Sequence, residues 1–483
     1  MTDASTLPLD ADTLAMAVLT FCGDGPDALM FAALKGAASP RLLLTLIART
    51  EYAACPAWLL GDDEKGTSRA SDACGNPTDP AVDSQLDRIF ATGLTRWGRR
   101  ADLQAMKSFH TAVARWRQRL ARMRIESFGR LADQLTCGGG QWLISPSSPQ
   151  WPGQLNDLAI RSDWAPPLCL WGMGDPSALT SCEAPVAVVG SREVTDYGRY
   201  VARNVGLEAA RHGHLVVSGG AMGADAAAHW GAIAAQDERI AGDDPDHAGR
   251  TVAVFAGGLD HRGPARNMPL FDAIVEHGGA LVSEMPPGTI PEARRFLLRN
   301  RIIAAMAGTI VIAQARHRSG ALNTATWAAE MSRDVYAAPG DIDEPYNTGC
   351  NRLVHDGKAT LLASATDIGD ICHAGHDPLI RPVAERNAPP EPRDEEAGET
   401  GTDGTLNRQQ RAVVTAIRSC RRRHVAATPD TILDYLRRRH PSWRCSAATV
   451  QITLAALETA RIIDMTGRDG IRLVTSRQPD ATA

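Results

Sequence analysis

The chain has 483 residues, of which 44% are hydrophobic and 22% are charged, and its formal net charge is −5. A chain of this length is expected to form two or three domains with one large core. No apolar run approaches the roughly 20 residues that a membrane-spanning helix needs, and the acidic N-terminus does not resemble a secretory signal. We therefore expect a cytoplasmic globular protein.

The net charge argues superficially against a nucleic-acid partner, because binding to a polyanion draws on a basic surface. However, six acidic residues against one arginine between positions 391 and 403 account for −5, so the remainder of the chain is close to neutral. Prolines, acids and glycines dominate residues 374–404, which predicts a disordered linker. Local basic patches therefore remain possible elsewhere.

The ten cysteines are scattered along the chain, and no pair has the spacing of metal ligands. This distribution favours reduced, mostly buried thiols over a zinc site or a disulfide framework. We expect no metal.

Residues 1–140 are expected to form a helical N-terminal domain. Leu, Ala, Met and Phe recur at helical spacing in the first 50 residues, and Gly23-Asp24-Gly25-Pro26 separates the first helix from the second. A polar stretch at about 61–80 predicts a mobile loop. The helical pattern returns over about 82–135, where arginines are dense. These arginines either contact phosphates or form a solvated helix face, and the pattern favours the solvated face.

Residues 141–373 are expected to form an α/β core. Trp142-Leu143-Ile144 predicts a strand, and residues 150–155 and 165–170 predict an extended lead-in. Five short apolar runs follow, each leading through a loop into helix-compatible sequence: 186–189, 215–218, 251–255, 280–283 and 309–313. This alternation predicts an extended Rossmann-like, doubly wound parallel sheet. In such sheets ligands bind at the carboxyl ends of the strands.

Residues 405–476 are expected to form a compact C-terminal domain. Helix-compatible segments at about 407–421, 428–439 and 446–460 precede two short strand-like runs around Gly467-Arg468-Asp469-Gly470. Three helices and a hairpin are the order of a winged helix, with Val450, Leu454 and Leu457 facing its core. Its basic residues lie outside the third helix, which favours protein docking or nonspecific contact over sequence-specific reading of DNA.

Cofactor and catalytic motifs are incomplete. The turn from Gly190 to Thr195 lacks the G-x-G-x-x-G pattern of a dinucleotide site. Gly357-Lys358-Ala359-Thr360 lacks the upstream glycine and the metal-binding hydroxyl of a phosphate loop. Ser218, Asp225 and His229 invite a triad interpretation, but no nucleophile elbow surrounds the serine, and backbone hydrogen bonding of Ser218 and Asp225 is favoured. We expect neither a cofactor nor enzymatic turnover.

The loops after the strands do offer groups that bind anions. Gly219-Gly220-Ala221-Met222-Gly223 comes directly before a predicted helix, so its backbone N–H groups lie at the positive end of the helix dipole. Arg192 follows the first strand, and its guanidinium can bind a phosphate with two hydrogen bonds.

Further arginines surround Phe296 and precede the Ser319-Gly320 turn. They are Arg294, Arg295, Arg299, Arg301, Arg316 and Arg318. Basic side chains interleaved with an aromatic ring suit a single nucleic-acid strand, because phosphates track along the cations and a base stacks on the ring. Core packing of Phe296 stays an open alternative. Structural pairing of some arginines with acids is equally open, the candidates being Glu284, Glu292 and Glu330.

Several motifs together resemble the DNA-processing protein A (DprA/Smf) family over roughly 150–365. They are Val189-Gly190-Ser191-Arg192, Tyr197-Gly198, Ser218 to His229, Gly257-Gly258-Leu259-Asp260, Ser283 to Gly288, Phe296 to Ala304, Ser319 to Ala325, Pro339-Gly340 and Asn347 to Asn351. The resemblance implies an extended Rossmann-like core that binds single-stranded DNA, usually as a homodimer. It also implies a non-enzymatic role in which the recombinase RecA is loaded onto incoming single strands during natural transformation.

The resemblance further implies which residues bind DNA when the family motif is carried over by position. They are Ser191, Arg192, Gly219, Gly220, Phe296, Arg299, Arg301, Arg318 and Asn323. Three positions depart from the family pattern. Met222 stands where the family has arginine, Gly263 where it has tyrosine, and Leu297 where it has proline.

Two other functions remain as alternatives. A nucleotide-hydrolysing relative of the phosphoribohydrolases would carry a P-G-G-x-G-T-x-x-E loop, whereas this chain has Ser319-Gly320-Ala321-Leu322-Asn323-Thr324-Ala325-Thr326, with Glu330 later. A winged-helix regulator with a ligand-sensing core is the other alternative.

Overall fold

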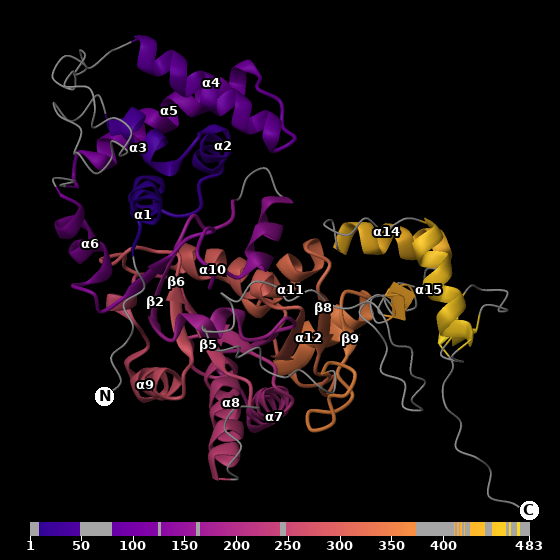
Figure 1. Ribbon diagram of the computed structural model, residues 1–483. Helices are drawn as coiled ribbons and strands as arrows, with labels where there is room; N and C mark the ends of the chain where they lie inside the picture. Colours follow the sequence, from indigo (N-terminus) through magenta and orange to yellow (C-terminus); the bar gives the residue numbers. More distant parts are fainter. Residues whose placement is uncertain are drawn as a thin grey trace, which may run out of the picture. The chain divides into compact units, whose positions relative to one another are not determined.

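The computed structural model describes residues 9–48, 80–123, 127–160, 165–241 and 248–372, together with parts of 410–473. The chain divides into two compact units, Met1–Asn387 and Ala388–Ala483. The first contains a helical region and an α/β region, and the second contains short helices and strands (Figure 1).

The described residues of the N-terminal region form six helices: α1 (Ala11–Gly23), α2 (Ala28–Gly36), α3 (Pro40–Ala48), α4 (Pro80–Arg96), α5 (Leu103–Leu120) and α6 (Phe128–Thr136). Asp10 and Asp27 cap α1 and α2 by accepting hydrogen bonds from backbone N–H groups of their first turns. Asp24 ends α1 in the left-handed conformation with φ of 59°, which confirms the predicted break there. The helical pattern predicted over 82–135 corresponds to three helices, α4, α5 and α6. Of the loop predicted at about 61–80, all residues except Pro80 lie outside the described residues.

The arginines of this region hold its helices together. Nη2 of Arg117 lies 3.1 Å from Asp83, and Arg119 donates to the backbone oxygen of Cys22 and to Asp24. These contacts join α5 to α4 and α1. Arg117 and Arg119 therefore pair with groups of the same chain. Neither of the two predicted alternatives, phosphate contact or a solvated helix face, describes these two arginines fully.

In the part of the α/β region that the structure describes, nine strands form one sheet in the order β1-β2-β6-β5-β4-β3-β7-β8-β9. The strands are β1 (Trp142–Ile144), β2 (Leu170–Gly174), β3 (Val186–Gly190), β4 (Val216–Gly219), β5 (Thr251–Phe255), β6 (Ala280–Ser283), β7 (Thr309–Gln314), β8 (Asp334–Ala337) and β9 (Thr360–Leu361). All five strands predicted from apolar runs are confirmed, as is the strand at Trp142. The sheet is parallel from β6 to β9, and it is mixed because β2 runs antiparallel to both β1 and β6.

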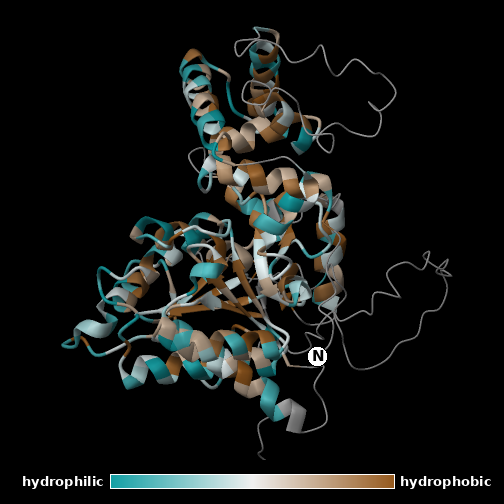
Figure 2. Cartoon of the chain, turned by 90° about the vertical axis from the view of Figure 1, so that its left-hand side faces the viewer, coloured by the Kyte–Doolittle hydropathy of each residue, from teal (hydrophilic) through white to brown (hydrophobic). Residues whose placement is uncertain are grey.

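Helices cover both faces of this sheet. They are α7 (Asp196–Arg211), α8 (Ala224–Ala241), α9 (Met268–Glu276), α10 (Ala293–Met306), α11 (Ala321–Glu330) and α12 (Thr348–His355). Alternate residues of β3 face opposite ways, so Val188 packs with residues of α7 and α8 while Ala187 packs with residues of α10 and α11. The hydrophobic strands therefore lie between two helical layers, as Figure 2 shows in brown and teal.

One segment differs from its predicted extended form. Residues Gly153–Ile160 form a 3-10 helix, η2, in which Leu155 and Leu158 are fully buried. Their spacing of three residues matches one turn of such a helix, and this places both leucines on one face. The extended prediction is therefore wrong for residues 153–155, whereas Leu170 begins β2.

The second unit contains α14 (Pro429–Arg439), α15 (Ala447–Thr459) and an antiparallel pair, β10 (Ile463–Asp464) and β11 (Arg472–Leu473). Val450, Leu454 and Leu457 are buried in its core, as predicted. A winged helix stays a prediction for this unit. The predicted linker and the predicted turn at 467–470 lie outside the described residues.

Among the described residues, no single helix is long and apolar enough to cross a membrane. Only the bent pair of α2 and α3, at 114° to each other, reaches the required length and composition together.

The close crossing of α2 and α4 gives a stability prediction. A Cβ at Gly93 would overlap the backbone oxygen of Ala32, so Gly93→Ala must push the two helices apart. We expect it to lower the free energy of unfolding by about 1–3 kcal/mol, measured by urea unfolding. Gly129→Ala in α6 is the matched control, because no described atom lies within 4 Å of its Cβ position. The control should be neutral or stabilising by up to about 1 kcal/mol; equal losses in both variants would contradict the prediction.

Candidate functional site

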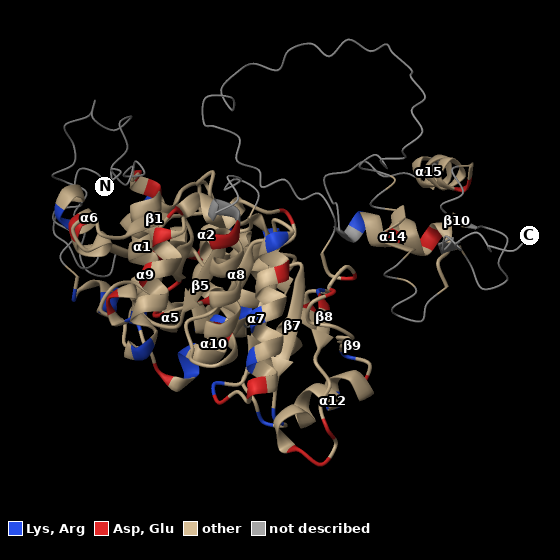
Figure 3. Ribbon diagram, turned by 90° about the horizontal axis from the view of Figure 1, so that it is seen from below, with Lys and Arg blue, Asp and Glu red and all other residues tan. Residues whose placement is uncertain are grey.

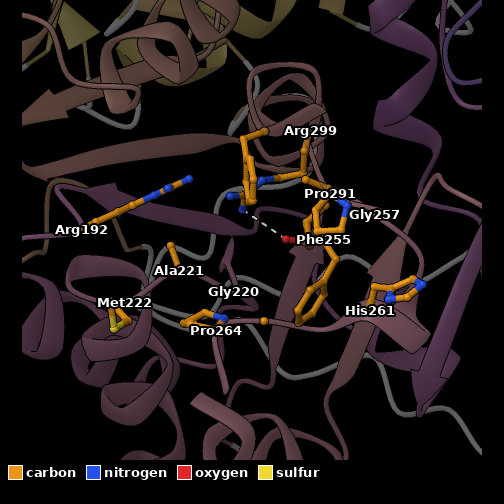
Figure 4. Close-up of a pocket in the computed structure, with 14 residues that line it drawn as sticks. Arg192, Gly220, Ala221, Met222, Phe255, Gly257, His261, Pro264, Pro291 and Arg299 are labelled. Carbon is orange, nitrogen blue, oxygen red and sulfur yellow. Dashed lines mark hydrogen bonds between the residues drawn. The ribbon is translucent and has the colours of Figure 1, made fainter. Parts of the chain in front are cut away.

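A pocket of about 280 Å³ opens at the carboxyl ends of β4 and β5, beside the start of α10. Its lining comes from four separate segments, as Figure 4 shows. The lining residues are Arg192, Gly220, Ala221, Met222, Val254, Phe255, Ala256, Gly257, His261, Gly263, Pro264, Pro291, Phe296 and Arg299. Most of the wall is apolar, and two arginines provide its cations.

Arg192 lies at the mouth of the pocket, in the turn between β3 and α7. Its Cζ is 4.7 Å from the centre of the Phe296 ring, which is a cation–π contact. The Arg192 side chain is exposed and Phe296 is half-buried. One face of the ring is therefore already covered by the guanidinium, and the two side chains act as one wall.

Arg299 lies deeper and is buried, with 6% of its surface exposed. Nη1 donates to the backbone oxygen of Val254 at 3.1 Å and lies 4.0 Å from a carboxylate oxygen of Asp225. Within the described residues, Nε of Arg299 has no hydrogen-bond acceptor. Burial lowers the pKa of Arg299, while Asp225 opposes this shift and Arg192 adds to it. The guanidinium is thus a buried cation with incomplete compensation.

The two glycines after β4 make this arrangement possible. A Cβ at Gly219 would overlap Nη1 of Arg299, and a Cβ at Gly220 would lie 2.8 Å from the Phe255 ring. The backbone oxygen of Gly220 accepts a hydrogen bond from Nδ2 of buried Asn267. The glycines therefore let the loop lie directly on the side chains that line the pocket.

The possible triad of Ser218, Asp225 and His229 does not form. Oγ of Ser218 donates to the backbone oxygen of Val188, and the buried Asp225 carboxylate interacts with the backbone of Ala221 and with the Ser218 side chain. Both ring nitrogens of His229 are engaged, with Thr251 at 2.6 Å and with the backbone oxygen of Gly219 at 3.0 Å. Both residues contact backbone groups as predicted, and Ser218 also contacts Asp225, but His229 is bonded to neither of them.

Arg301 is not part of the pocket. It is fully buried, and its Nη2 lies 2.6 Å from Oε2 of Glu284, which is also buried. This contradicts the predicted contact of Arg301 with a strand, because no part of its side chain reaches the surface. Arg295 on the same helix binds Asp24 of α1 at 2.7 Å. The alternative of structural pairing is correct for Arg301.

The remaining predicted residues are not in the lining of the pocket. The Ser191 hydroxyl accepts a hydrogen bond from the N–H of Glu193 and so closes its own turn. Arg318 is exposed in the loop between β7 and α11, and Asn323 accepts a hydrogen bond from Asn300 of α10 at 3.5 Å. None of Ser191, Arg318 and Asn323 lines the pocket.

Several lining residues were not anticipated from the sequence. Phe255 ends a predicted strand, so its place at the carboxyl edge was a usable signal. His261, Pro264 and Pro291 lie close to motifs of the family resemblance, at Gly257 to Asp260, at Gly263 and at Ser283 to Gly288, but they were not themselves predicted as site residues. Among the described residues, no group of three His, Cys, Asp or Glu side chains is placed to hold a metal ion.

Comparison with known proteins gives consistent matches. Residues 142–373 match the family model for DNA recombination-mediator protein A. The putative DNA processing protein DprA of Mycobacterium tuberculosis (strain CDC 1551 / Oshkosh) is 38% identical over 254 residues, which cover 51% of this chain and 61% of that protein. The DNA processing protein DprA of Bacillus subtilis (strain 168) is 36% identical over 225 residues, covering 47% of this chain and 69% of that protein. The X-ray structure of DprA from Streptococcus pneumoniae aligns with a TM-score of 0.46 and 27% identity over 58% of this chain and 90% of that one.

The buried histidine next to the pocket predicts a pH dependence of stability. Burial lowers the pKa of His229 to about 4, below its value of about 6.5 in an unfolded chain. The unfolded state therefore binds a proton that the folded state excludes, and stability falls as the pH drops from about 6.5 to about 4. Between about pH 7 and about pH 5, the wild type should lose about 2 kcal/mol more than His229→Gln, measured by urea unfolding. An equal loss in both proteins would show that His229 does not titrate in this way.

Proposed function

This chain belongs to the DNA recombination-mediator protein A (DprA/Smf) family, and we propose that it binds single-stranded DNA in the pocket of Arg192, Phe296 and Arg299. The family model covers the sheet that forms this pocket. The proposed role is DNA processing in recombination.

The observation that carries the proposal is the state of Arg299. Its guanidinium is buried, lines the pocket, and lies 4.0 Å from the Asp225 carboxylate. A buried cation whose nearest carboxylate is this far away is costly, so it is suited to an anionic ligand that enters the pocket. Arg192 adds a second, exposed cation at the mouth. A phosphate between the two arginines would meet charge-assisted donors from both sides.

The apolar wall favours a single strand over a duplex. Phe255, Pro264 and Pro291 offer surfaces for the flat face of a base, whereas a duplex keeps its bases stacked and paired. The backbone at Gly219 and Gly220 lies close to the pocket and can approach the sugar–phosphate chain. We assign Ser191, Arg318 and Asn323 to the path of the strand beside the pocket, and we leave out Arg301 because it is buried against Glu284.

The proposal extends to partners. We propose that the bound strand is passed to RecA during natural transformation, that the protein acts as a homodimer, and that it has no catalytic turnover. A RecA filament assay on a single strand covered by single-strand-binding protein tests this step. Faster filament growth in the presence of this protein supports RecA loading, and an unchanged rate refutes it.

Nucleotide hydrolysis is disfavoured by the position of Glu330. This residue ends α11, whereas Ser319-Gly320 precede the helix, so the carboxylate is displaced by about 14 Å along the helix axis. The loop and the acid therefore do not meet as a phosphoribohydrolase site requires.

The central prediction concerns strand preference and salt. In fluorescence anisotropy, the protein should bind an unstructured labelled oligonucleotide more tightly than its duplex, and affinity should fall steeply with salt. Arg192→Ala should weaken binding about tenfold for all sequences and reduce the salt slope by about 0.7. Arg352→Ala on α12, an exposed arginine outside the pocket, is the control and should change nothing. Equal binding by wild type and Arg192→Ala would remove Arg192 from the site.

A substitution of Met222 is predicted to strengthen DNA binding, whereas Arg192→Ala is predicted to weaken it. It lines the pocket with 42% of its surface exposed, at a position where the family motif has arginine. Met222→Arg should add one phosphate contact, strengthen single-strand binding several-fold at low salt, and steepen the salt slope by about 0.7. Met222→Leu is the neutral control. An unchanged slope in Met222→Arg would show that the strand does not pass this residue.

A further inference from the structure

A second hollow, of about 540 Å³, adjoins the first pocket. It lies between α7, α8 and the short helix η6 (Ala265–Asn267). Arg192 and Met222 line both hollows, so the two hollows border each other at these side chains. No motif in the sequence pointed to this second hollow.

The second hollow is basic. Arg199 and Arg203 lie one turn apart on α7 and therefore share a helix face, and Arg266 approaches from η6. Figure 3 shows the basic segments along α7 in blue. Glu193 is the one acidic residue in the lining, against four arginines. Arg199 also lies 3.9 Å from Asp196, but both side chains are well exposed, so this ion pair is weak.

An exposed aromatic ring lies among these cations. Trp230 on α8 has 39% of its surface exposed and lines the hollow. Ala226, one turn earlier on the same helix face, also lines it and leaves space beside the indole. A tryptophan ring bordered by arginines is the combination that binds a nucleobase by stacking and its phosphates by charge.

The two hollows are fixed relative to each other. Asn267, next to Arg266, is buried and donates through Nδ2 to the backbone oxygen of Gly220, which lines the first pocket. α8 begins directly after the glycine loop and carries Trp230. The border that a strand would cross between the two hollows is therefore formed by Met222 and Arg192.

We propose that the second hollow binds the nucleotides that follow those in the first pocket, with a base stacked on Trp230 and phosphates at Arg203 and Arg266. This inference rests on the proposed function, because it extends the same strand. It makes binding depend on oligonucleotide length. A strand of about 4 nucleotides occupies only the first pocket, whereas one of about 16 nucleotides reaches both.

The test compares oligothymidylates of about 4 and about 16 nucleotides by fluorescence anisotropy. Trp230→Ala and Arg203→Gln should bind the short strand like the wild type and the long strand about tenfold more weakly. Arg203→Gln should also reduce the salt slope for the long strand by about 0.7. Trp230→Phe keeps a stacking surface and should restore most of the lost affinity. Tyr200→Ala, an exposed aromatic on α7 that lines neither hollow, is the matched control.

Two results would overturn the inference. If Trp230→Ala and Arg203→Gln bind the long strand as tightly as the wild type does, the strand does not enter the second hollow. If they weaken the short and the long strand alike, the residues belong to the first pocket or to the fold, and no extension exists. Failure of the proposed function looks different, because the wild type would then bind neither strand.

Intrinsic fluorescence provides an independent measurement. Stacking of a base on Trp230 should quench part of the tryptophan emission when the long strand binds. This contribution to the quenching should be absent in Trp230→Phe and present in Tyr200→Ala. Equal quenching in all three proteins would place the base elsewhere.

Discussion

The candidate site depends on one buried cation. The guanidinium of Arg299 lies under the end of β4 and is held by the backbone oxygen of Val254, with Asp225 at 4.0 Å. This position exists only because Gly219 has no side chain, since a Cβ there would overlap Nη1. Burying a charge with so little compensation is costly, and an anion in the pocket would relieve that cost. The energetic cost of burying Arg299 and the suitability of the pocket for phosphate thus have the same origin.

Three arginines of helix α10 have three different structural roles. Arg295 binds Asp24 and so connects the α/β region to the helical region, while Arg301 neutralises Glu284 inside the core. Arg299 faces the pocket. The three arginines lie within two turns of one helix but have different surroundings, because each points from the helix in a different direction and meets a different partner.

Helix α8 relates the two hollows in a similar way. Its first turns carry Asp225 and His229, which are buried, and the next residue, Trp230, is exposed on another face of the helix. One helix therefore supports the first pocket from inside and presents an aromatic ring to the second hollow. The path that we propose for the strand passes along this helix.

The sequence by itself determined the five central strands, the glycine loop, the helical N-terminal region and, through the family resemblance, the group of Arg192, Gly220, Phe296 and Arg299. These are recoverable because apolar runs and glycine turns reflect local backbone requirements and burial. Only the tertiary structure decided that Arg301 pairs with Glu284, that β2 runs antiparallel, and that Arg199, Arg203, Trp230 and Arg266 line one hollow. Local periodicity records which side of an element is buried, but not which distant charge or ring lies opposite, and those contacts are made by packing alone.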